Sequence, residues 1–504
     1  MTESLAEVRE ETAGGGFAER AGQALRAAAA LVAALYVACA LIQAGARVVY
    51  PYQLDYYEGE LLDYAHDFAR GRLPWAATTT PPWSVHNYGP VYPALWGEVM
   101  ALGRPESFWP GRLVAVAGLL LAALCLALLV RRFSGQWLPA LVAAGVFLWF
   151  PAVRGWTALA RVDTLGVGLT LAGFTVFLLG SPRARVWGTL LFVLAVGTKQ
   201  TMLAAPVAAY AALWLQGERR SAALHLALFL GLILATCAVL QVVSHGGFAR
   251  DTILANMNKW DATQARHYLG GFLSTGPILL GVALAGGLVA LGAPKYRALG
   301  LYLFLAMAGT ATVGKIGARP NYFVEPTAVA AVFLGLALAH SSRLPRGLAL
   351  GATLLPALAL TQLVLQWMPP SLGPPRSQRA ADADLVALVR AQPGEVLSEH
   401  LGAVVQAGKT LWTEPSVTSA MTEEGHWDQA PLLQLIRERK FSLIVKLSRG
   451  TGTLASEWWD PADWTPEEVQ AIVANYHLRG VAGRPTPAEA AYGLLVPNSP
   501  ASAP

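Results

Sequence analysis

Long apolar runs separated by short polar segments fill the chain up to residue 368. Crossing about 30 Å of hydrocarbon takes about 20 helical residues, because each residue advances an α-helix by about 1.5 Å. The stretch 186–216 is interrupted by Thr198, Lys199 and Gln200, which favours two short helices around a polar turn. Together with nine other runs, this pattern predicts about eleven membrane-spanning helices. The nine runs are 27–48, 112–130, 138–152, 164–180, 222–243, 271–292, 298–313, 325–340 and 347–368.

Basic residues occur in pairs in every second loop between these runs. Cytoplasmic loops of membrane proteins hold an excess of Lys and Arg, so these loops are expected to face the cytoplasm. Alternation then places the N-terminus in the cytoplasm of a multi-pass protein of the plasma membrane, and the loop 49–111 on the outer side. The pairs are Arg131 and Arg132, Arg183 and Arg185, Arg219 and Arg220, Lys295 and Arg297, and Arg343 and Arg346.

The sequence changes character after the Pro-rich segment Met368-Pro369-Pro370 and becomes as polar as an ordinary globular protein. Short β-type runs at 395–398 and 441–447 alternate with helical patterns, which indicates a small α/β unit. Its Pro- and Ala-rich end, from about residue 483, is expected to fray. The predicted fold class is therefore an all-α polytopic membrane protein with a small C-terminal α/β domain. The predicted parts are a cytoplasmic tail at 1–26, a transmembrane domain at 27–368 and an extracytoplasmic domain at 369–504.

Composition agrees with a membrane protein and excludes other classes. The 504 residues are 54% hydrophobic and 14% charged, with a mean hydropathy of +0.43, which is too apolar for an ordinary soluble protein. The net charge of +5 is scattered in pairs and forms no continuous basic stripe, so nucleic acid is not an expected partner. The three cysteines fall inside apolar runs and predict neither a disulfide framework nor a zinc cluster.

Carboxylates and aromatic residues are concentrated in the loop after the first run. Asp55 and Glu58 lie three residues apart and share one face if the segment is helical. Outside a membrane, such a pair can deprotonate an acceptor hydroxyl or bind a divalent cation. A helix start that simply favours acidic residues is the structural alternative. Further along the loop, His86, Tyr88 and Tyr92 suit either the membrane interface or a sugar-binding surface.

Five cations lie on the predicted outer side, against the orientation rule. Charges near membrane spans are costly unless they are paired or used. Asp163 beside Arg161 and Glu325 near Lys315 can satisfy some of them, and an anionic lipid headgroup can satisfy the rest. A phosphate leaving group needs such cations, because negative charge builds on its oxygens as the bond to the sugar breaks. The five are Arg154, Arg161, Lys199, Lys315 and Arg319.

The predicted cytoplasmic loops contain no Walker-type phosphate loop, no Asp-x-Asp pair and no domain large enough for a nucleotide sugar. The Asp-x-Asp at Asp382-Ala383-Asp384 lies in the predicted outer domain and fits the start of a helix. A sugar donor on the outer face would therefore have to arrive attached to a lipid.

Five short motifs make the chain resemble the GT-C membrane glycosyltransferases, in particular the protein O-mannosyltransferase and aminoarabinose transferase group (glycosyltransferase family 39-like). The resemblance covers residues 27 to about 340. The motifs are Asp55-x-x-Glu58, Tyr88-Gly89-Pro90-Val91-Tyr92, Arg161-Val162-Asp163, Thr198-Lys199-Gln200, and the segment from Lys315 to Glu325.

The resemblance implies a polyprenyl-phosphate-linked sugar as donor and a lipid, glycan or protein acceptor that approaches from outside. It also implies an acidic base in the first loop, which Asp55 matches best, and we expect inversion at the anomeric carbon. Two tyrosines separate Asp55 from Glu58 where many relatives have adjacent acids, so the identity of the base and a role for a divalent cation stay open. The predicted phosphate-binding residues are Arg161, Lys199, Lys315 and Arg319, and the predicted substrate-binding residues are His86, Tyr88, Tyr92, Asp163, Gln200, Asn321, Tyr322 and Glu325.

Two other functions are compatible with a polytopic membrane protein. A transporter or lipid flippase would use the outer charges as a substrate path, and it predicts broken helices in two corresponding halves. The sequence shows no such halves. The other alternative is a non-catalytic membrane anchor for the outer domain, in which the loop acids are merely solvated.

Overall fold

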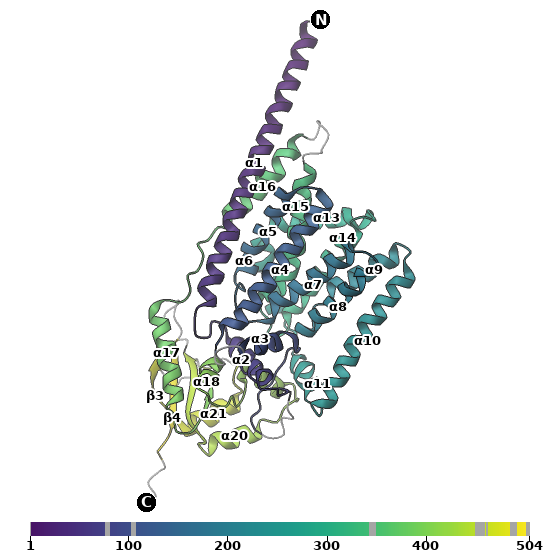
Figure 1. The fold of residues 1–504 in the computed structure, drawn as a ribbon. Helices are drawn as coiled ribbons and strands as arrows, with labels where there is room; N and C mark the ends of the chain where they lie inside the picture. Colours follow the sequence, from purple (N-terminus) through teal and green to yellow (C-terminus); the bar gives the residue numbers. More distant parts are fainter. Residues whose placement is uncertain are drawn as a thin grey trace, which may run out of the picture.

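The computed structural model forms a helix at each of the eleven predicted positions (Figure 1). The helices pack around a core of apolar side chains, among which Tyr36, Trp149 and Phe174 are almost fully buried. The structure describes residues 2–75, 81–101, 107–341, 349–448, 459, 462–483 and 491–499. The eleven helices are α1 (Thr2–Val48), α4 (Trp109–Ser134), α5 (Trp137–Trp149), α7 (Val162–Leu179), α8 (Ala184–Thr198), α9 (Ala204–Leu215), α10 (Arg219–Val243), α13 (Pro277–Gly292), α14 (Arg297–Gly309), α15 (Val324–Ser341) and α16 (Ala349–Leu365).

Within the described residues, six helices are long and apolar enough to cross a membrane. A seventh span is added if α12 (Ala262–Thr275) and α13, which meet at an angle of 90°, are counted as one. The helices α5, α8 and α9 are apolar but shorter, so the expected eleven complete crossings exceed what helix length supports. The chain is a multi-pass membrane protein whose bundle also contains short helices.

The first loop, residues 49–108, carries two further helices, α2 (Tyr56–Ala69) and α3 (Val91–Ala101). Asp55 is the N-cap of α2: its side chain accepts a hydrogen bond from the backbone N–H of Tyr57, and Glu58 reaches back to the backbone N–H of Asp55. The acids that begin the loop therefore start a helix, as the structural alternative predicted.

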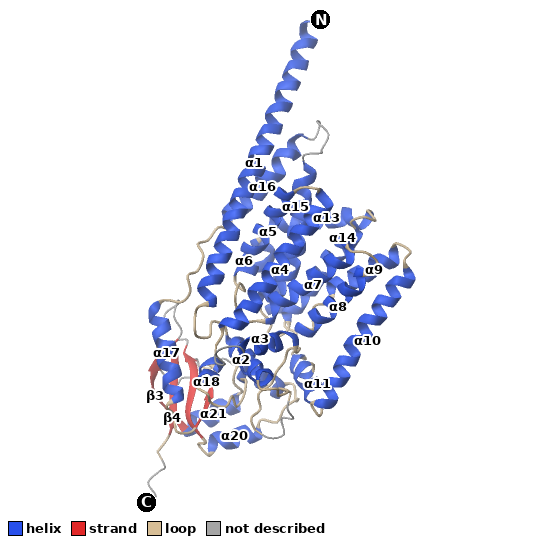
Figure 2. Cartoon of the chain, in the orientation of Figure 1, coloured by secondary structure: helices blue, strands red, loops and turns tan. Residues whose placement is uncertain are grey.

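The C-terminal residues form a four-stranded mixed sheet covered by short helices (Figure 2). The strand order is β1-β2-β4-β3, in which β1 and β2 are parallel and the other two pairs are antiparallel. The strands are β1 (Glu395–Ser398), β2 (Phe441–Ser448), β3 (Tyr476–Ala482) and β4 (Ala491–Pro497). The helices are α17 (Arg376–Arg390), α18 (Leu401–Gln406), α19 (Pro415–Glu423), α20 (Ala430–Arg437) and α21 (Pro466–Asn475).

Two expectations for this domain are wrong. The tail does not fray at 491–497, because this apolar run forms β4 and pairs with both β2 and β3. Asp382 does not start a helix, because α17 begins at Arg376 and Asp382 lies inside it. The Asp382 carboxylate instead accepts a hydrogen bond of 2.6 Å from the hydroxyl of Tyr50.

The C-terminal domain packs directly on the first loop, at the end of the bundle opposite the N-terminus (Figure 1). Gln53 Oε1 accepts a hydrogen bond from the backbone N–H of Gly402 at 2.6 Å, and Trp83 forms a β-bridge with Thr413. The first loop is therefore enclosed between the bundle and the sheet domain.

Candidate functional site

Two carboxylates and two cations form a continuous chain of ion pairs where the first loop meets the bundle. Arg161 Nη1 donates to Asp55 Oδ1 at 2.6 Å, and Arg161 Nε donates to Asp163 Oδ2 at 3.3 Å. Lys199 Nζ and Asn321 Nδ2 both donate to Asp163 Oδ1, at 2.6 and 2.7 Å. Five sequence-predicted positions, Asn321 among them, thus meet in one network.

Helix ends position these side chains. Asp55 and Arg161 are the N-caps of α2 and α7, Asp163 lies in the first turn of α7, and Lys199 is the C-cap of α8. Helix ends leave backbone groups without helical partners, so in a membrane protein they occur at polar boundaries. The polar turn predicted at residues 198–200 therefore brings Lys199 to the site.

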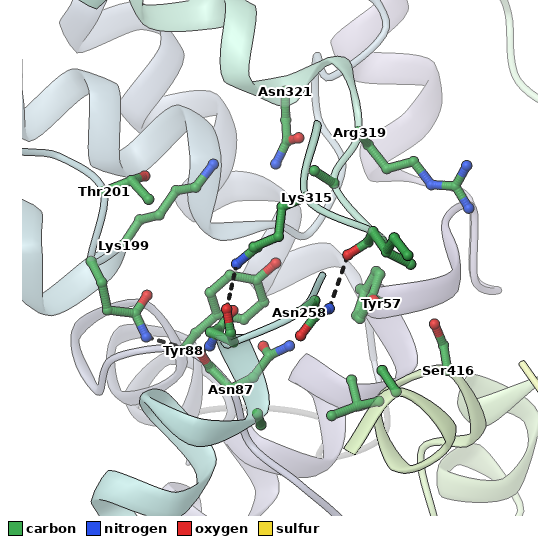
Figure 3. Close-up of a pocket in the computed structure, with 18 of the residues that line it drawn as sticks. Tyr57, Asn87, Tyr88, Lys199, Thr201, Asn258, Lys315, Arg319, Asn321 and Ser416 are labelled. Atoms are coloured by element: carbon green, nitrogen blue, oxygen red, sulfur yellow. Dashed lines mark hydrogen bonds between the residues drawn. The ribbon is translucent and has the colours of Figure 1, made fainter. Parts of the chain in front are cut away.

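Two neighbouring cavities share this network. Lys199 and Lys315 line the first cavity (Figure 3), and Asp55 lines the second, which has a volume of about 530 Å³. Arg161 and Arg319 line both, so Asp55 and Lys199 belong to adjacent cavities with a common wall. The predicted residues that line the first cavity are Tyr88, Arg161, Lys199, Gln200, Lys315, Arg319, Asn321 and Tyr322.

Of the four cations that line the cavities, two lack an acidic partner. Within the described residues, neither Lys315 nor Arg319 forms an ion pair within 4.0 Å. Lys315 Nζ donates to the carbonyl of Asn256 at 2.9 Å, and Arg319 Nη1 reaches the hydroxyl of Tyr268 only at 3.5 Å. Burial, followed by the charge of Lys199, lowers the pKa of Lys315. These two cations leave uncompensated positive charge at the cavities.

The expected pairing of Glu325 with Lys315 is wrong. Glu325 lies in the first turn of α15 and accepts a hydrogen bond of 3.0 Å from the hydroxyl of Tyr302, inside the bundle. Glu325 lines neither cavity.

Glu58 is also absent from both cavity walls, because it forms a buried ion pair with Arg112. Arg112 Nε and Nη2 donate to the two oxygens of Glu58 at 2.9 and 2.8 Å, and both side chains are fully buried. The backbone N–H groups of Ala160 and Leu54 also donate to this carboxylate, each at 2.6 Å. Burial opposes the charge of Glu58, but Arg112 holds its pKa below the ordinary value.

These contacts bear on the expected divalent cation. Hydrogen bonds occupy both oxygens of Glu58, so Asp55 and Glu58 do not present a joint pair of ligands. In the described part of the chain, no group of three or more His, Cys, Asp and Glu side chains is arranged to hold a metal ion.

Two predicted aromatic residues lie behind the site. His86 is buried against the ring of Tyr64, where burial lowers its pKa to about 4. The hydroxyl of Tyr92 donates to the carbonyl of Gly111 at 2.7 Å, which ties the start of α3 to α4. Neither residue lines a cavity, whereas Tyr88 does, and its hydroxyl accepts from Arg161 Nη2 at 3.3 Å.

Several wall residues could not be found from the motifs. Tyr57 stacks under the Arg161 guanidinium at 4.7 Å and lines both cavities, although it separates Asp55 from Glu58 in the sequence. The C-terminal domain adds others, including Ser416, and nothing in the local sequence signals that contact.

Solved structures share this architecture. The aminoarabinose transferase ArnT from Cupriavidus metallidurans superimposes in its apo state with a TM-score of 0.59, at 15% identity over 92% of this chain and 97% of that one. ArnT bound to undecaprenyl phosphate gives a TM-score of 0.58 at 14% identity, over 92% of this chain and 97% of that one. The Archaeoglobus fulgidus oligosaccharyltransferase in complex with Zn and sulfate gives 0.52 at 14% identity, over 88% of this chain and 71% of that one.

These enzymes are GT-C glycosyltransferases, and the chain therefore has the GT-C fold that its motifs predicted. No protein-family pattern matches the sequence, and no curated protein matches it either.

Proposed function

We propose that this protein is a glycosyltransferase that moves a sugar from a polyprenyl-phosphate carrier to an acceptor hydroxyl. The shared fold supports this reaction class, since ArnT has been solved with undecaprenyl phosphate bound. The proposal places the reaction on the extracytoplasmic face of the plasma membrane. The basic loop pairs support that orientation, because the loops that carry them alternate with those at the cavities.

The charge balance of the two cavities is the observation that carries the proposal. Arg161 and Lys199 are neutralised by Asp55 and Asp163, whereas Lys315 and Arg319 remain unpaired among the described residues. A lipid-phosphate sugar is a phosphodiester with about one negative charge, and the released lipid phosphate carries about 1.5 to 2. Two unpaired cations therefore favour the leaving group over the bound donor, which lowers the barrier to sugar transfer.

In the proposed mechanism, Asp55 is the catalytic base in the second cavity. Asp55 accepts the proton of the acceptor hydroxyl, whose oxygen attacks the anomeric carbon from the side opposite the phosphate. The bond between the anomeric carbon and the phosphate oxygen breaks, its electron pair stays on the phosphate, and the carbon is inverted. Lys315, Arg319 and Lys199 stabilise that charge, and Asn321 orients Asp163 within the network.

Glu58 has a different role in this proposal. Its ion pair with Arg112 and its bond to the backbone N–H of Asp55 fix the N-terminus of α2, so Glu58 positions the base without touching substrate.

The test is lipid-phosphate release by the full-length protein in nanodiscs, with undecaprenyl phosphate that carries labelled mannose, glucose or aminoarabinose. Lys315→Met and Arg319→Gln are each expected to slow release by about 10²-fold, the typical effect of losing one charge-stabilising group. Lys259→Met is the matched control, because Lys259 is exposed and lines neither cavity. In a parallel assay in proteoliposomes, movement of the labelled lipid from one leaflet to the other without phosphate release would replace this proposal with a flippase.

A further inference from the structure

The second cavity is built by two separate parts of the chain. One wall comes from the first loop and the bundle and includes Asp55, Trp156 and Arg319. The opposite wall comes from the C-terminal domain and includes His400 and Tyr492. A ligand in this cavity therefore touches the proposed base and the sheet domain at the same time.

The wall from the sheet domain is the carboxyl edge of its parallel strand pair. Glu399 and His400 directly follow β1, and Leu447 lies at the end of β2. Loops that follow adjacent parallel strands meet at one edge of a sheet, where open α/β domains bind ligands. Glu399 itself is occupied, since it accepts from the backbone N–H of Leu447 and from the indole of Trp464. Glu399 thus holds the end of β2 and Trp464 in place, and His400, the next residue, offers its side chain to the cavity.

His400 offers a hydrogen-bond donor to the cavity. Its Nδ1 accepts from the backbone N–H of Ala403 at 3.0 Å and so caps α18. Burial lowers the pKa of His400, so the ring is neutral and carries its one proton on Nε2. Among the described residues no group accepts from Nε2, although His400 is only 3% exposed and lines the cavity.

Within the described residues, the cavity wall also contains two glutamines, one with a free hydrogen-bond donor and one with a free acceptor. Gln53 uses Oε1 to accept from Gly402, which leaves its amide N–H groups as donors. Gln264 uses Nε2 to donate to the carbonyls of Val313 and Lys315, which leaves its Oε1 as an acceptor. A sugar presents several hydroxyls, each of which donates and accepts, so it can use a mixed set of this kind more fully than an alcohol with a single hydroxyl can.

Aromatic rings stand on both walls of the cavity, Trp156 on the bundle and Tyr492 on the sheet domain. The C–H groups on the face of a pyranose ring are slightly positive and pack well on the negative face of an aromatic ring. A volume of about 530 Å³ lies within the usual range for small-ligand sites, about 300 to 1,000 Å³.

We propose that the acceptor is a carbohydrate and that the carboxyl edge of β1 and β2 is its binding subsite. His400 donates to a sugar hydroxyl, and Tyr492 packs on the sugar ring. This inference rests on the proposed glycosyl transfer, since it identifies the substrate class of the second cavity.

The experiment measures binding of methyl α-mannoside and methyl β-glucoside to the full-length protein in nanodiscs by saturation-transfer NMR. N-acetyl-threonine amide is the competing peptide-like probe. His400→Asn keeps a side chain that caps a helix, but its amide N–H groups lie nearer the backbone, so no donor remains at the position of Nε2. Tyr492→Leu removes the ring. We expect each variant to bind the glycosides at least tenfold more weakly, with unchanged affinity for undecaprenyl phosphate. His477→Asn is the control, because His477 lies on β3 and lines neither cavity.

Equal glycoside binding by the wild type and both variants would overturn the inference, as would binding of the threonine probe alone or of no glycoside. Thermal unfolding of each variant shows whether weaker binding comes from loss of the fold. A different result would contradict the proposed function: a wild type that binds glycosides but releases no lipid phosphate from any labelled donor.

Discussion

At the scale of single residues, Arg161 connects the two cavities. Its guanidinium bonds to Asp55 and Asp163, and it lies over the rings of Tyr57 and Trp156 at 4.7 and 5.2 Å. Burial disfavours its charge, but neighbouring groups, with Asp55 the strongest, raise the pKa of Arg161 well above its ordinary value. Arg161 therefore holds the proposed base at the wall that the two cavities share.

Asp55→Asn tests the base at this scale. Asparagine keeps an oxygen that can accept from Arg161 and from the backbone N–H of Tyr57, but it cannot take a proton. We expect lipid-phosphate release to slow by about 10²- to 10⁴-fold with unchanged donor affinity. Asp67→Asn is the control, because Asp67 pairs with Arg72 on the surface. Release by Asp55→Asn at the wild-type rate would show that another group is the base.

Glu58→Gln is predicted to act on stability. Removing one partner of a buried ion pair leaves Arg112 charged and unpaired, which costs about 3–5 kcal/mol. We expect a clearly lower midpoint of thermal unfolding, whereas Glu98→Gln, at an exposed position of α3, should unfold like the wild type. A variant that unfolds normally but releases no lipid phosphate would instead give Glu58 a chemical role.

At the scale of helices and strands, the sequence predicts positions well because the membrane imposes a local rule. A run of about 20 apolar residues must be a helix in hydrocarbon, whatever its neighbours are. Every predicted run is accordingly helical in the structure. β4 was missed because seven residues, 491–497, carry too little local signal beside a Pro- and Ala-rich tail. Its strand pairing depends on β3, which directly precedes it, and on β2, which lies further back in the sequence.

Some motif residues serve packing between elements. Gly89, in the Tyr-Gly-Pro motif, lies so close to α8 that a Cβ atom there would meet the carbonyl oxygen of Gly197 at 2.1 Å. The glycine therefore lets the first loop reach the turn that carries Lys199.

Gly59→Ala is the prediction for the contact between α2 and α18. A Cβ atom on Gly59 would lie 2.3 Å from the backbone nitrogen of Gly402, and backbone cannot move aside as a flexible side chain can. We expect the C-terminal domain to be displaced, seen as faster proteolysis in the connection at 366–375 and a lower unfolding midpoint. Gly480→Ala, where a Cβ meets nothing within 4 Å, should behave as the wild type. Equal proteolysis of the two variants would show that the contact between α2 and α18 tolerates the methyl group.

At the scale of the whole molecule, the site is an assembly of distant segments. Asp55 and Arg161 are 106 positions apart, and the C-terminal wall of the second cavity lies further still along the chain. The sequence predicted the charged residues because cations and acids are rare beside apolar runs. It could not predict that Glu58 pairs with Arg112, because that contact depends on how α2 packs on α4. Nor could it predict that His400 lines the second cavity, because that depends on how the sheet domain packs on the loop.

That junction also contains buried acids, which predict how stability varies with pH. Glu60 in α2 and Glu414 before α19 are both fully buried. Burial, and then the charge of Glu414, raise the pKa of Glu60 well above the ordinary 4.5, and burial raises the pKa of Glu399 to about 7. Between the ordinary value and the raised value, the folded protein holds more protons than the unfolded chain. These acids therefore stabilise the folded protein most below about pH 4.5. Their contribution to the free energy of unfolding is lost as the pH rises through their raised pKa values.

We expect the unfolding midpoint of the full-length protein in nanodiscs to fall between pH 5 and pH 8. Glu60→Gln replaces the carboxyl with a neutral group of the same shape, so it should raise the midpoint at pH 8 and flatten the dependence on pH. Glu438→Gln is the control, because Glu438 is exposed on the same sheet domain and should leave the slope unchanged. A wild-type midpoint that stays constant or rises between pH 5 and pH 8 would show that these acids are ionised when the domain is docked, and that cations stabilise the junction.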